Sequence, residues 1–184
     1  MVPNTAKTIS AILVIAISLT KATVMPGQAP SGKFHKNILV EIGGTGRIMT
    51  INYDMRLKRG VQGAWGIRAG IGASLGFFEE APKVKSGPGI ISIPLEVNYL
   101  FGKRRSFFET GFALTPIHVN YEKISIVGDN FLYGPRWAWF ALAKIGYRFQ
   151  PLHHGVMFGV NIVGGRWPGG YISGSGITLG YGFK

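Results

Sequence analysis

The sequence contains no cysteine among its 184 residues. This excludes disulfide frameworks, thiolate metal sites, cysteine nucleophiles and cysteine-anchored lipoproteins. Acidic residues are also scarce: there are 8 Asp and Glu against 20 Lys and Arg, and charged residues make up only 15% of the chain. That low share of charge, together with a mean hydropathy of +0.21, is unusual for a soluble domain.

The apolar run 9–19 is too short for a membrane-spanning helix, which needs about 20 apolar residues. Lys7 precedes this run, and the small-x-small triplets 20–22 and 27–29 follow it. This combination predicts a secretory signal over residues 1–29, removed on export. We expect residues 30–36 to be a flexible lead-in and residues 37–184 to form one domain, because the length leaves room for only one.

The formal net charge of +12 raises the question of nucleic-acid binding. The basic residues form short clusters, such as 58–59 and 103–105, rather than a stripe along a helix, and no aromatic-plus-basic RNA-binding motif is present. Such clusters beside apolar strands fit anionic lipid headgroups better. We therefore predict no nucleic-acid partner.

The stretch 65–77 shows the clearest pattern in the chain. Apolar side chains occupy every odd position, whereas the even positions hold glycine, serine and a single arginine, Arg68. Unbroken period-two alternation predicts a strand, and this one is longer than most strands of soluble proteins. A strand with lipid on one side and a narrow polar interior on the other has this composition.

Seven further segments are predicted as strands. With 65–77, they give an even number, so the sheet can close and leave no unpaired edge in hydrocarbon. A bulge is expected near Pro116, where the apolar phase shifts, and residues 165–174 are expected to link the last two strands. The remaining predicted strands are 37–43, 47–57, 90–101, 107–121, 136–150, 156–164 and a last one ending at Lys184.

The connections and the aromatic residues give the predicted barrel two different ends. The two longest connections, 78–89 and 122–135, fall at one end, as expected for the outer loops of a barrel with short periplasmic turns. Aromatic residues collect near both ends of the strands, which predicts two interfacial girdles. The girdle at the end with short turns consists of Trp65, Tyr99, Phe101, Tyr147, Phe149, Tyr181 and Phe183, and the opposite girdle consists of Phe77, Tyr121, Trp137, Trp139 and Tyr171.

Eight charged residues fall on the faces expected to point inward. An eight-stranded barrel is just wide enough for side chains to fill it, and buried charges must pair. We predict a salt-bridged interior; a gated pore or a proton path through the same residues is the alternative. These residues are Glu41, Asp54, Glu96 and Glu109 with Arg56, Arg68, Lys144 and Arg148.

Other motifs give no catalytic, cofactor-binding or metal-binding prediction. The G-x-S-x-G pattern at 72–76 lies within a straight strand, whereas a nucleophile elbow needs a sharp strand-to-helix turn. His153 and His154 are adjacent in a short turn, which favours a solvated turn over a metal site. His118 is near the expected outer girdle, and its motif is His118-Val119-Asn120.

Alternating strands after a signal, with a final Tyr181-Gly182-Phe183, resemble the small eight-stranded outer-membrane β-barrel proteins of Gram-negative bacteria. The resemblance covers residues 37–184. It implies an all-β, eight-stranded antiparallel up-and-down transmembrane barrel in the outer membrane, and it implies that Tyr181 and Phe183 form the signal read by the barrel-assembly machinery. Lys184 departs from the family pattern, in which an aromatic residue is usually last.

The resemblance also sets the expected partners: outer-membrane lipids, lipopolysaccharide, the assembly machinery and an extracellular ligand at the loops. We expect a structural or surface-interaction role, exposing loops 78–89 and 122–135. A lipid A-modifying enzyme is one alternative, although the deacylases of that group carry His-x-Ser where this chain has Asn120. A soluble lipocalin-like carrier is the other, and it requires the apolar faces to point inward.

Overall fold

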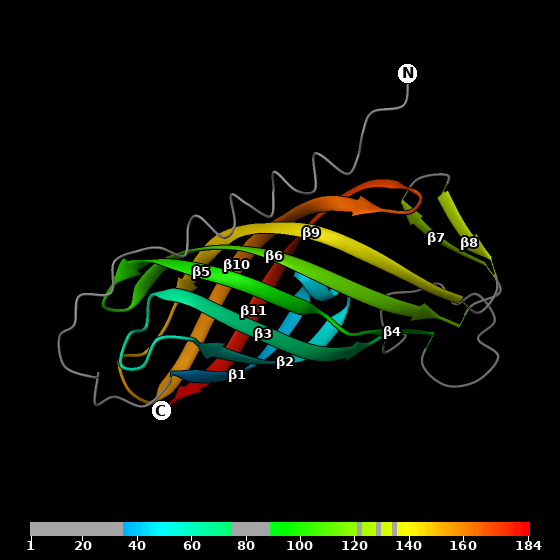
Figure 1. Ribbon diagram of the computed structural model, residues 1–184. Helices are drawn as coiled ribbons and strands as arrows, with labels where there is room; N and C mark the ends of the chain where they lie inside the picture. The colour runs from blue at the N-terminus through cyan, green and yellow to red at the C-terminus, as the bar shows by residue number, and fades with distance from the viewer. Residues whose placement is uncertain (1–34, 75–88, 121–122, 128–129, 134–135) are drawn as a thin grey trace, which may run out of the picture. The chain divides into compact units, whose positions relative to one another are not determined.

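The period-two segments form the wall of a closed β-barrel (Figure 1). The computed structural model describes residues 35–74, 89–120, 123–127, 130–133 and 136–184. Among these residues, no helix is long and apolar enough to cross a membrane. The elements are β1 (Lys36–Gly43), η1 (Gly44–Gly46), β2 (Met49–Arg56), β3 (Ala64–Ala73), β4 (Ile90–Ser92), β5 (Leu95–Lys103), β6 (Ser106–Val119), β7 (Lys123–Val127), β8 (Asn130–Tyr133), β9 (Arg136–Phe149), β10 (Gly155–Trp167) and β11 (Gly170–Phe183).

Every strand of the wall pairs antiparallel with a neighbour on each side, and β1 closes the sheet against β11. β4 and β5 together make one wall strand, since both lie between β3 and β6 in a single continuous register. Pro94, which has no N–H to donate, interrupts this strand. The ladder nevertheless continues through Pro94, whose carbonyl accepts a hydrogen bond of 3.0 Å from the N–H of Gly70. The predicted eight-stranded antiparallel barrel is therefore confirmed.

The two ends of the barrel differ. At one, here called the turn end, the short connections 57–63, 104–105 and 150–154 join β2 to β3, β5 to β6 and β9 to β10. At the other, the loop end, the connections 44–48, 74–89, 120–135 and 168–169 join the remaining pairs. Both of the long connections lie at the loop end, as the sequence predicts.

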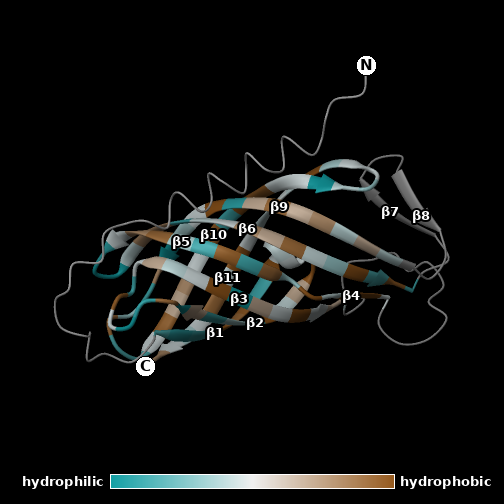
Figure 2. Cartoon of the chain, in the orientation of Figure 1, coloured by the Kyte–Doolittle hydropathy of each residue, from teal (hydrophilic) through white to brown (hydrophobic). Residues whose placement is uncertain are grey.

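The alternation also sets the two faces of the wall. Apolar side chains such as Ile71, 62% exposed, project outward from the odd positions of β3, while Arg68 and the other even positions face inward. Figure 2 shows hydrophobic and hydrophilic residues alternating along the strands. This outward direction argues against the soluble carrier, whose apolar faces would have to line the interior.

Two sequence predictions at the loop end are wrong. The bulge near Pro116 is absent: β6 keeps one register with β9 from Ser106 to Val119. The apolar phase shifts because Ile117 and Val119 point into the barrel, where they are buried. The expected link 165–174 is also wrong, since β10 runs to Trp167 and β11 begins at Gly170.

Two further segments differ from their predicted extent. Connection 122–135 contains a hairpin of β7 and β8, which pair with each other in a separate two-stranded sheet. The predicted end of the third strand, beyond Ser74, lies outside the described residues, as does most of loop 78–89.

The interior has two halves of different chemistry. The half toward the turn end holds the charged residues, together with the buried apolar side chains of Leu39, Leu100, Phe107 and Met157. The half toward the loop end is filled by a buried apolar cluster, with Ile90 packed against it. The cluster consists of Ala113, Ile117, Val119, Ala138, Phe140, Leu142, Trp167 and Ile172.

Candidate functional site

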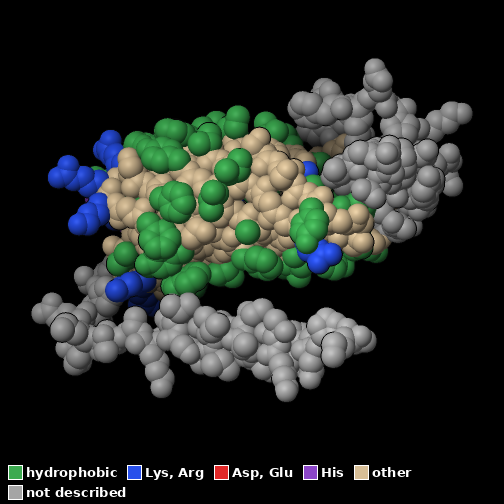
Figure 3. All heavy atoms as spheres, turned by 90° about the horizontal axis from the view of Figure 1, so that it is seen from above, with side chains coloured by type: hydrophobic (Ala, Val, Ile, Leu, Met, Phe, Trp, Pro, Cys, Tyr) green, Lys and Arg blue, Asp and Glu red, His purple; other side chains and the backbone are tan. Residues whose placement is uncertain are grey.

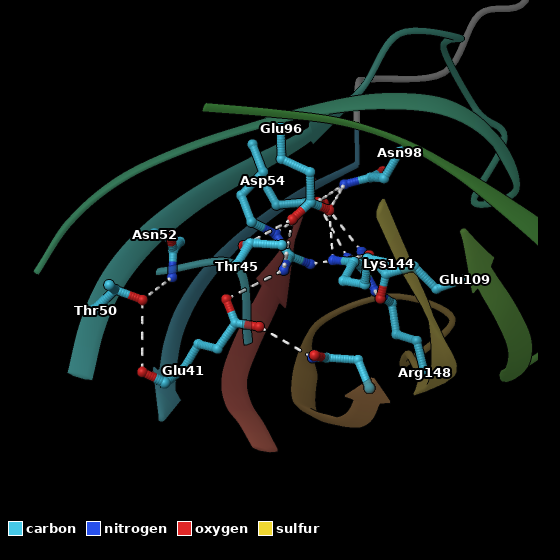
Figure 4. Close-up of polar contacts among 12 residues, drawn as sticks. Glu41, Thr45, Thr50, Asn52, Asp54, Glu96, Asn98, Glu109, Lys144 and Arg148 are labelled. Carbon is cyan, nitrogen blue, oxygen red and sulfur yellow. Dashed lines mark hydrogen bonds and ion pairs between the residues drawn. The ribbon is translucent and has the colours of Figure 1, made fainter. Parts of the chain in front are cut away.

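The polar half of the interior holds all eight charged residues that the sequence places on the inward faces. Each is at most 4% exposed, and together they carry four acidic and four basic groups. They come from β1, β2, β3, β5, β6 and β9, so they connect six of the eight wall strands. In Figure 4, Asp54 of β2, Glu96 of β5, and Lys144 and Arg148 of β9 project toward one another.

Asp54 is the most heavily bonded acid. Arg148 holds it in a fork, with Nη1–Oδ1 at 3.1 Å and Nη2–Oδ2 at 3.2 Å, and Arg56 Nη2 donates to Oδ2 at 2.7 Å. The side-chain amides of Asn37 and Asn98 donate to it at 3.0 and 3.1 Å. A carboxylate so fully surrounded by donors is fixed in place, which suits a structural crosslink.

Glu109 and Arg68 tie the other side of the barrel into the same network. Glu109 accepts hydrogen bonds from Arg68 Nη2 at 3.1 Å, Lys144 Nζ at 3.0 Å and Arg148 Nε at 3.1 Å. Arg68 also lies within 3.7 Å of a carboxylate oxygen of each of the other three acids. Arg68 is therefore the one base that contacts all four acids.

Glycine makes room for these long side chains. A Cβ at Gly66, on the inward face of β3, would lie 2.0 Å from Arg56 Nη2. Gly66 thus leaves room for the guanidinium of Arg56, and Gly70 and Gly72 leave room for the side chains of Asn52 and Thr50 on β2. The arrangement explains why the polar face of that strand carries glycine in place of larger polar residues.

The segment η1, Gly44–Gly46, is buried inside the barrel on the loop-end side of the ion pairs. Thr45 is fully buried; its hydroxyl donates to Glu96 Oε2 at 3.2 Å, and its carbonyl accepts from the hydroxyl of Thr115 at 2.8 Å. Lys144 also binds Glu96, on Oε1. Gly44 has φ +58, and a Cβ there would lie 2.1 Å from Glu41 Oε1, so the inward fold needs glycine at this position.

This segment separates the charged half from the apolar half. Glu41, beside it, accepts a hydrogen bond of 3.0 Å from the side-chain amide of Asn161 on β10. Beyond it, the guanidinium of Arg47 donates to the carbonyl of Ser173 at 3.3 Å and lies 5.9 Å from the ring centre of Phe140. The interior is thus packed with crosslinked side chains and an inserted turn.

The chemistry available to this site is limited by its geometry. Four acids and four bases neutralise one another, and each acid contacts at least one base within 3.7 Å. General acid–base catalysis needs a group that can reach a substrate, whereas these groups are enclosed by wall strands and by Thr45. The arrangement holds strands together.

The strands β10 and β11 contribute no charge to the interior. Their inward positions hold small or uncharged residues, of which Asn161 alone bonds to a member of the ion-pair network. The inward residues of β11 from Ile172 onward are Gly174, Gly176, Thr178, Gly180 and Gly182.

The remaining sequence candidates lie apart from the network. His118 is on the outward phase of β6, with its ring 5.0 Å from that of Trp137. His153 and His154 are exposed in the turn after β9, and the N–H of Ser74 donates to the carbonyl of Ile90 as part of a strand ladder. Tyr181 and Phe183 are on the outward face of β11, next to the turn end.

His35 lies at the turn end, just before β1, and is buried. Its burial, reinforced by the positive charges of Lys184, Arg56 and His153, lowers the pKa of its imidazole to about 4. His35 is therefore neutral at pH 7 in the folded protein.

Several functional contacts were missed in the sequence. The amides of Asn37, Asn98 and Asn161 share the inward phase with the charged residues, and that phase could have identified them. Thr45 had no such signal, because its position depends on a turn folding inward.

An outer belt of aromatic rings surrounds the turn end. The ring centres of Trp65 and Tyr99 are 5.1 Å apart, those of Tyr99 and Phe101 are 4.4 Å apart, and Phe149 stacks on Phe158 at 5.3 Å. Amphipathic rings at one level of an otherwise apolar wall are typical of a membrane–water interface. Of the predicted opposite girdle, Trp137, Trp139 and Tyr171 are exposed, while Phe77 and Tyr121 lie outside the described residues.

The fold and its faces define a class: an eight-stranded antiparallel barrel with an apolar outer wall and an ion-paired interior. No protein-family model matches the chain, and no curated protein matches it in sequence. Among solved structures, it is similar to the N-terminal β-barrel domain of Pseudomonas aeruginosa OprF, with a TM-score of 0.51 and 11% identity. The match covers 83% of this chain and all of that domain, and at this identity it shows the fold alone.

Proposed function

We propose that the chain is an exported precursor whose mature part is an outer-membrane β-barrel with a structural or surface-interaction role. The observation that carries the proposal is the outward apolar wall of a fully closed sheet. Its most exposed members include Ile71, Phe112 and Ile177, each about 60% exposed or more. A closed barrel satisfies every backbone group internally, which is what a lipid environment requires.

The shape of the outer wall supports contact with acyl chains. Two depressions of about 400 and 340 Å³ lie on it, one around Ala69 and the other around Ala73. Outward apolar side chains such as Tyr53, Leu95 and Ile51 line them. Flexible hydrocarbon can fill depressions of this kind, whereas exposure to water would be costly.

The packed interior favours a structural role over conduction. The buried ion pairs, whose charges cancel, and the buried Thr45 occupy the space that a pore would need. Surface interaction falls to the loop end, through connections 78–89 and 122–135. The lipid A-modifying alternative gains no specific support, since His118 packs on Trp137 and Asn120 stands at the serine position.

The proposal includes a processing and assembly route. Residues 1–29 act as the signal, residues 30–36 lead into the barrel, and Tyr181 with Phe183 are the contact for the assembly machinery. Lipopolysaccharide and outer-membrane lipids surround the mature wall. N-terminal sequencing of membrane-extracted protein is expected to start between Thr23 and Pro30, and a chain that retains Met1 would contradict the export step.

Cell fractionation with heat-modifiable gel mobility tests the proposal. The protein is expected in the outer-membrane fraction and should migrate differently in boiled and unboiled samples, because a closed barrel resists detergent unfolding. A soluble periplasmic protein without heat-modifiable mobility would refute the membrane assignment. Planar-bilayer recording separates the two interior roles, since steady ion conductance would replace the structural role with a pore.

A further inference from the structure

Cationic side chains gather at the turn end of the barrel. Lys58, Lys103, Arg104 and Arg105 are exposed there, and Lys36 lies on the outward phase at the start of β1. Figure 3 shows the largest group of Lys and Arg side chains at one end of the barrel, just beyond the apolar wall. We call these five residues the basic collar.

Acidic residues do not balance the basic collar. The four acids of the described residues are all buried in the interior network. Within the described chain, none of the five collar residues forms an ion pair with a carboxylate. The other four acids of the sequence occur in connections 74–89 and 120–135, which start and finish at the loop end, and residues 1–34 contain none.

The basic collar lies next to the aromatic belt. Phe101 belongs to that belt and Lys103 to the collar, on the same phase of β5 and two residues apart, which is about 7 Å along a strand. Interfacial aromatic rings lie at the level where acyl chains meet headgroups, so a side chain one step further out reaches the phosphate layer. Arg104, with φ 61, is in the tight turn that places three successive basic residues at this level.

We propose that the basic collar binds the phosphate groups of anionic glycerophospholipids in the leaflet at the turn end. The inference rests on the proposed membrane location and adds a lipid class and an orientation to it. Guanidinium groups bind phosphate through paired hydrogen bonds, and lysine adds point charges. A positive rim with no Asp or Glu side chain beside it among the described residues favours an anionic headgroup over a zwitterionic one.

Brominated-lipid quenching of tryptophan tests the collar. Trp65 lies in the belt beside the collar, whereas Trp139 is on the outward face toward the loop end. The test variant is the full chain with Trp137, Trp139 and Trp167 replaced by Phe, so that only Trp65 remains; the control variant keeps only Trp139. Each variant is placed in phosphatidylcholine vesicles that contain either brominated phosphatidylglycerol or brominated phosphatidylcholine.

We expect brominated phosphatidylglycerol to quench Trp65 roughly threefold or more strongly than brominated phosphatidylcholine does at low salt. The ratio of quenching by the two lipids should fall toward one in K103Q/R104Q/R105Q and at high salt. At Trp139, the same ratio should be near one. If Trp167→Phe impairs folding, Trp167 is kept, because it points inward and contributes equally to both lipid mixtures.

Three outcomes overturn the inference: no preference at Trp65, an equal preference at Trp139, or a preference that survives K103Q/R104Q/R105Q. Unbrominated lipids can also be added to compete with the brominated lipid and so reduce the quenching of Trp65. If lipopolysaccharide reduces it more than phosphatidylglycerol does, the collar belongs to the opposite leaflet and the inference is overturned. Absence of quenching by either brominated lipid, together with loss of heat-modifiable mobility, would instead show that the membrane location itself has failed.

Discussion

Replacing Ile71 by arginine tests whether the outward face of the barrel meets hydrocarbon. Ile71 projects outward with 62% of its surface exposed, opposite Ile51 on the neighbouring strand. It lies six residues beyond Trp65 of the aromatic belt, about 20 Å along the strand, or about 15 Å along the barrel axis for a strand tilted by about 40°. The apolar band of such barrels is about 25 Å tall, so Ile71 is near its middle.

The expected cost follows from that depth. A charged residue on the lipid face destabilises a barrel by about 2–4 kcal/mol at the midplane, and by about 0–1 kcal/mol near the interface. Ile67 is on the same face of β3, only two residues from Trp65, and is 43% exposed. Ile71→Arg should therefore lower the free energy of unfolding by about 2 kcal/mol more than Ile67→Arg does.

Reversible urea unfolding in lipid vesicles measures both variants against the native chain. The control is Ile71→Leu, which keeps an apolar side chain of the same volume and should change the free energy of unfolding little. Equal stability of Ile71→Arg and the native protein would refute the reasoning, because a face surrounded by water accepts arginine readily. Equal losses at residues 67 and 71 would also refute it, since they would remove the dependence on depth.

Three other predictions follow from the interior and the turn end. Arg68→Ala should lower the free energy of unfolding by about 3–5 kcal/mol in urea unfolding, because it leaves buried carboxylates without the base that they share. The double variant Arg68→Ala/Glu109→Gln should recover part of this loss. Gly44→Ala should cost about 1–3 kcal/mol by the same assay, since Gly44 has φ +58 and a Cβ there would meet Glu41. Ala64→Gly is the control: Ala64 has φ 72, a conformation that glycine adopts without strain, so this change should not destabilise the protein. The lowered pKa of His35 means that the unfolded chain binds more protons than the folded one between about pH 4 and 6.5; stability should fall as pH drops through this window, and His35→Asn should flatten that part of the pH profile.

The sequence allowed the charged interior and the outer wall to be predicted because both follow from period two. Where one face is charged or glycine-rich and the other apolar, as in β3, the strand can be oriented from sequence alone. The same rule failed in β6 beyond Thr115, where the inward face becomes apolar and the outward face carries His118. Ile117 and Val119 look like lipid-facing residues in the sequence, yet they fill the inner cluster. The mistaken bulge came from assuming that apolar means outward.

The inserted turn could not be predicted for a different reason. Gly43, Gly44 and Gly46 around Thr45 read as an exposed turn, and only the three-dimensional closure of the barrel brings Glu96 and Thr115 to that residue. Contacts separated by 51 and 70 positions in the chain carry no local sequence signal.

The distribution of charge among the strands bears on how the barrel can close. All eight ionised groups lie on β1 to β9, so the network can reach neutrality before the last hairpin arrives. The inward residues of β10 and β11 are all uncharged, so β11 forms the seam with β1 without burying a new charge. Within the described residues no ion pair crosses that seam, so its alignment depends on the backbone hydrogen bonds between β1 and β11, with Asn161 of β10 bonded to Glu41 of β1. The closing hairpin is thus the segment whose register is least specified by charge.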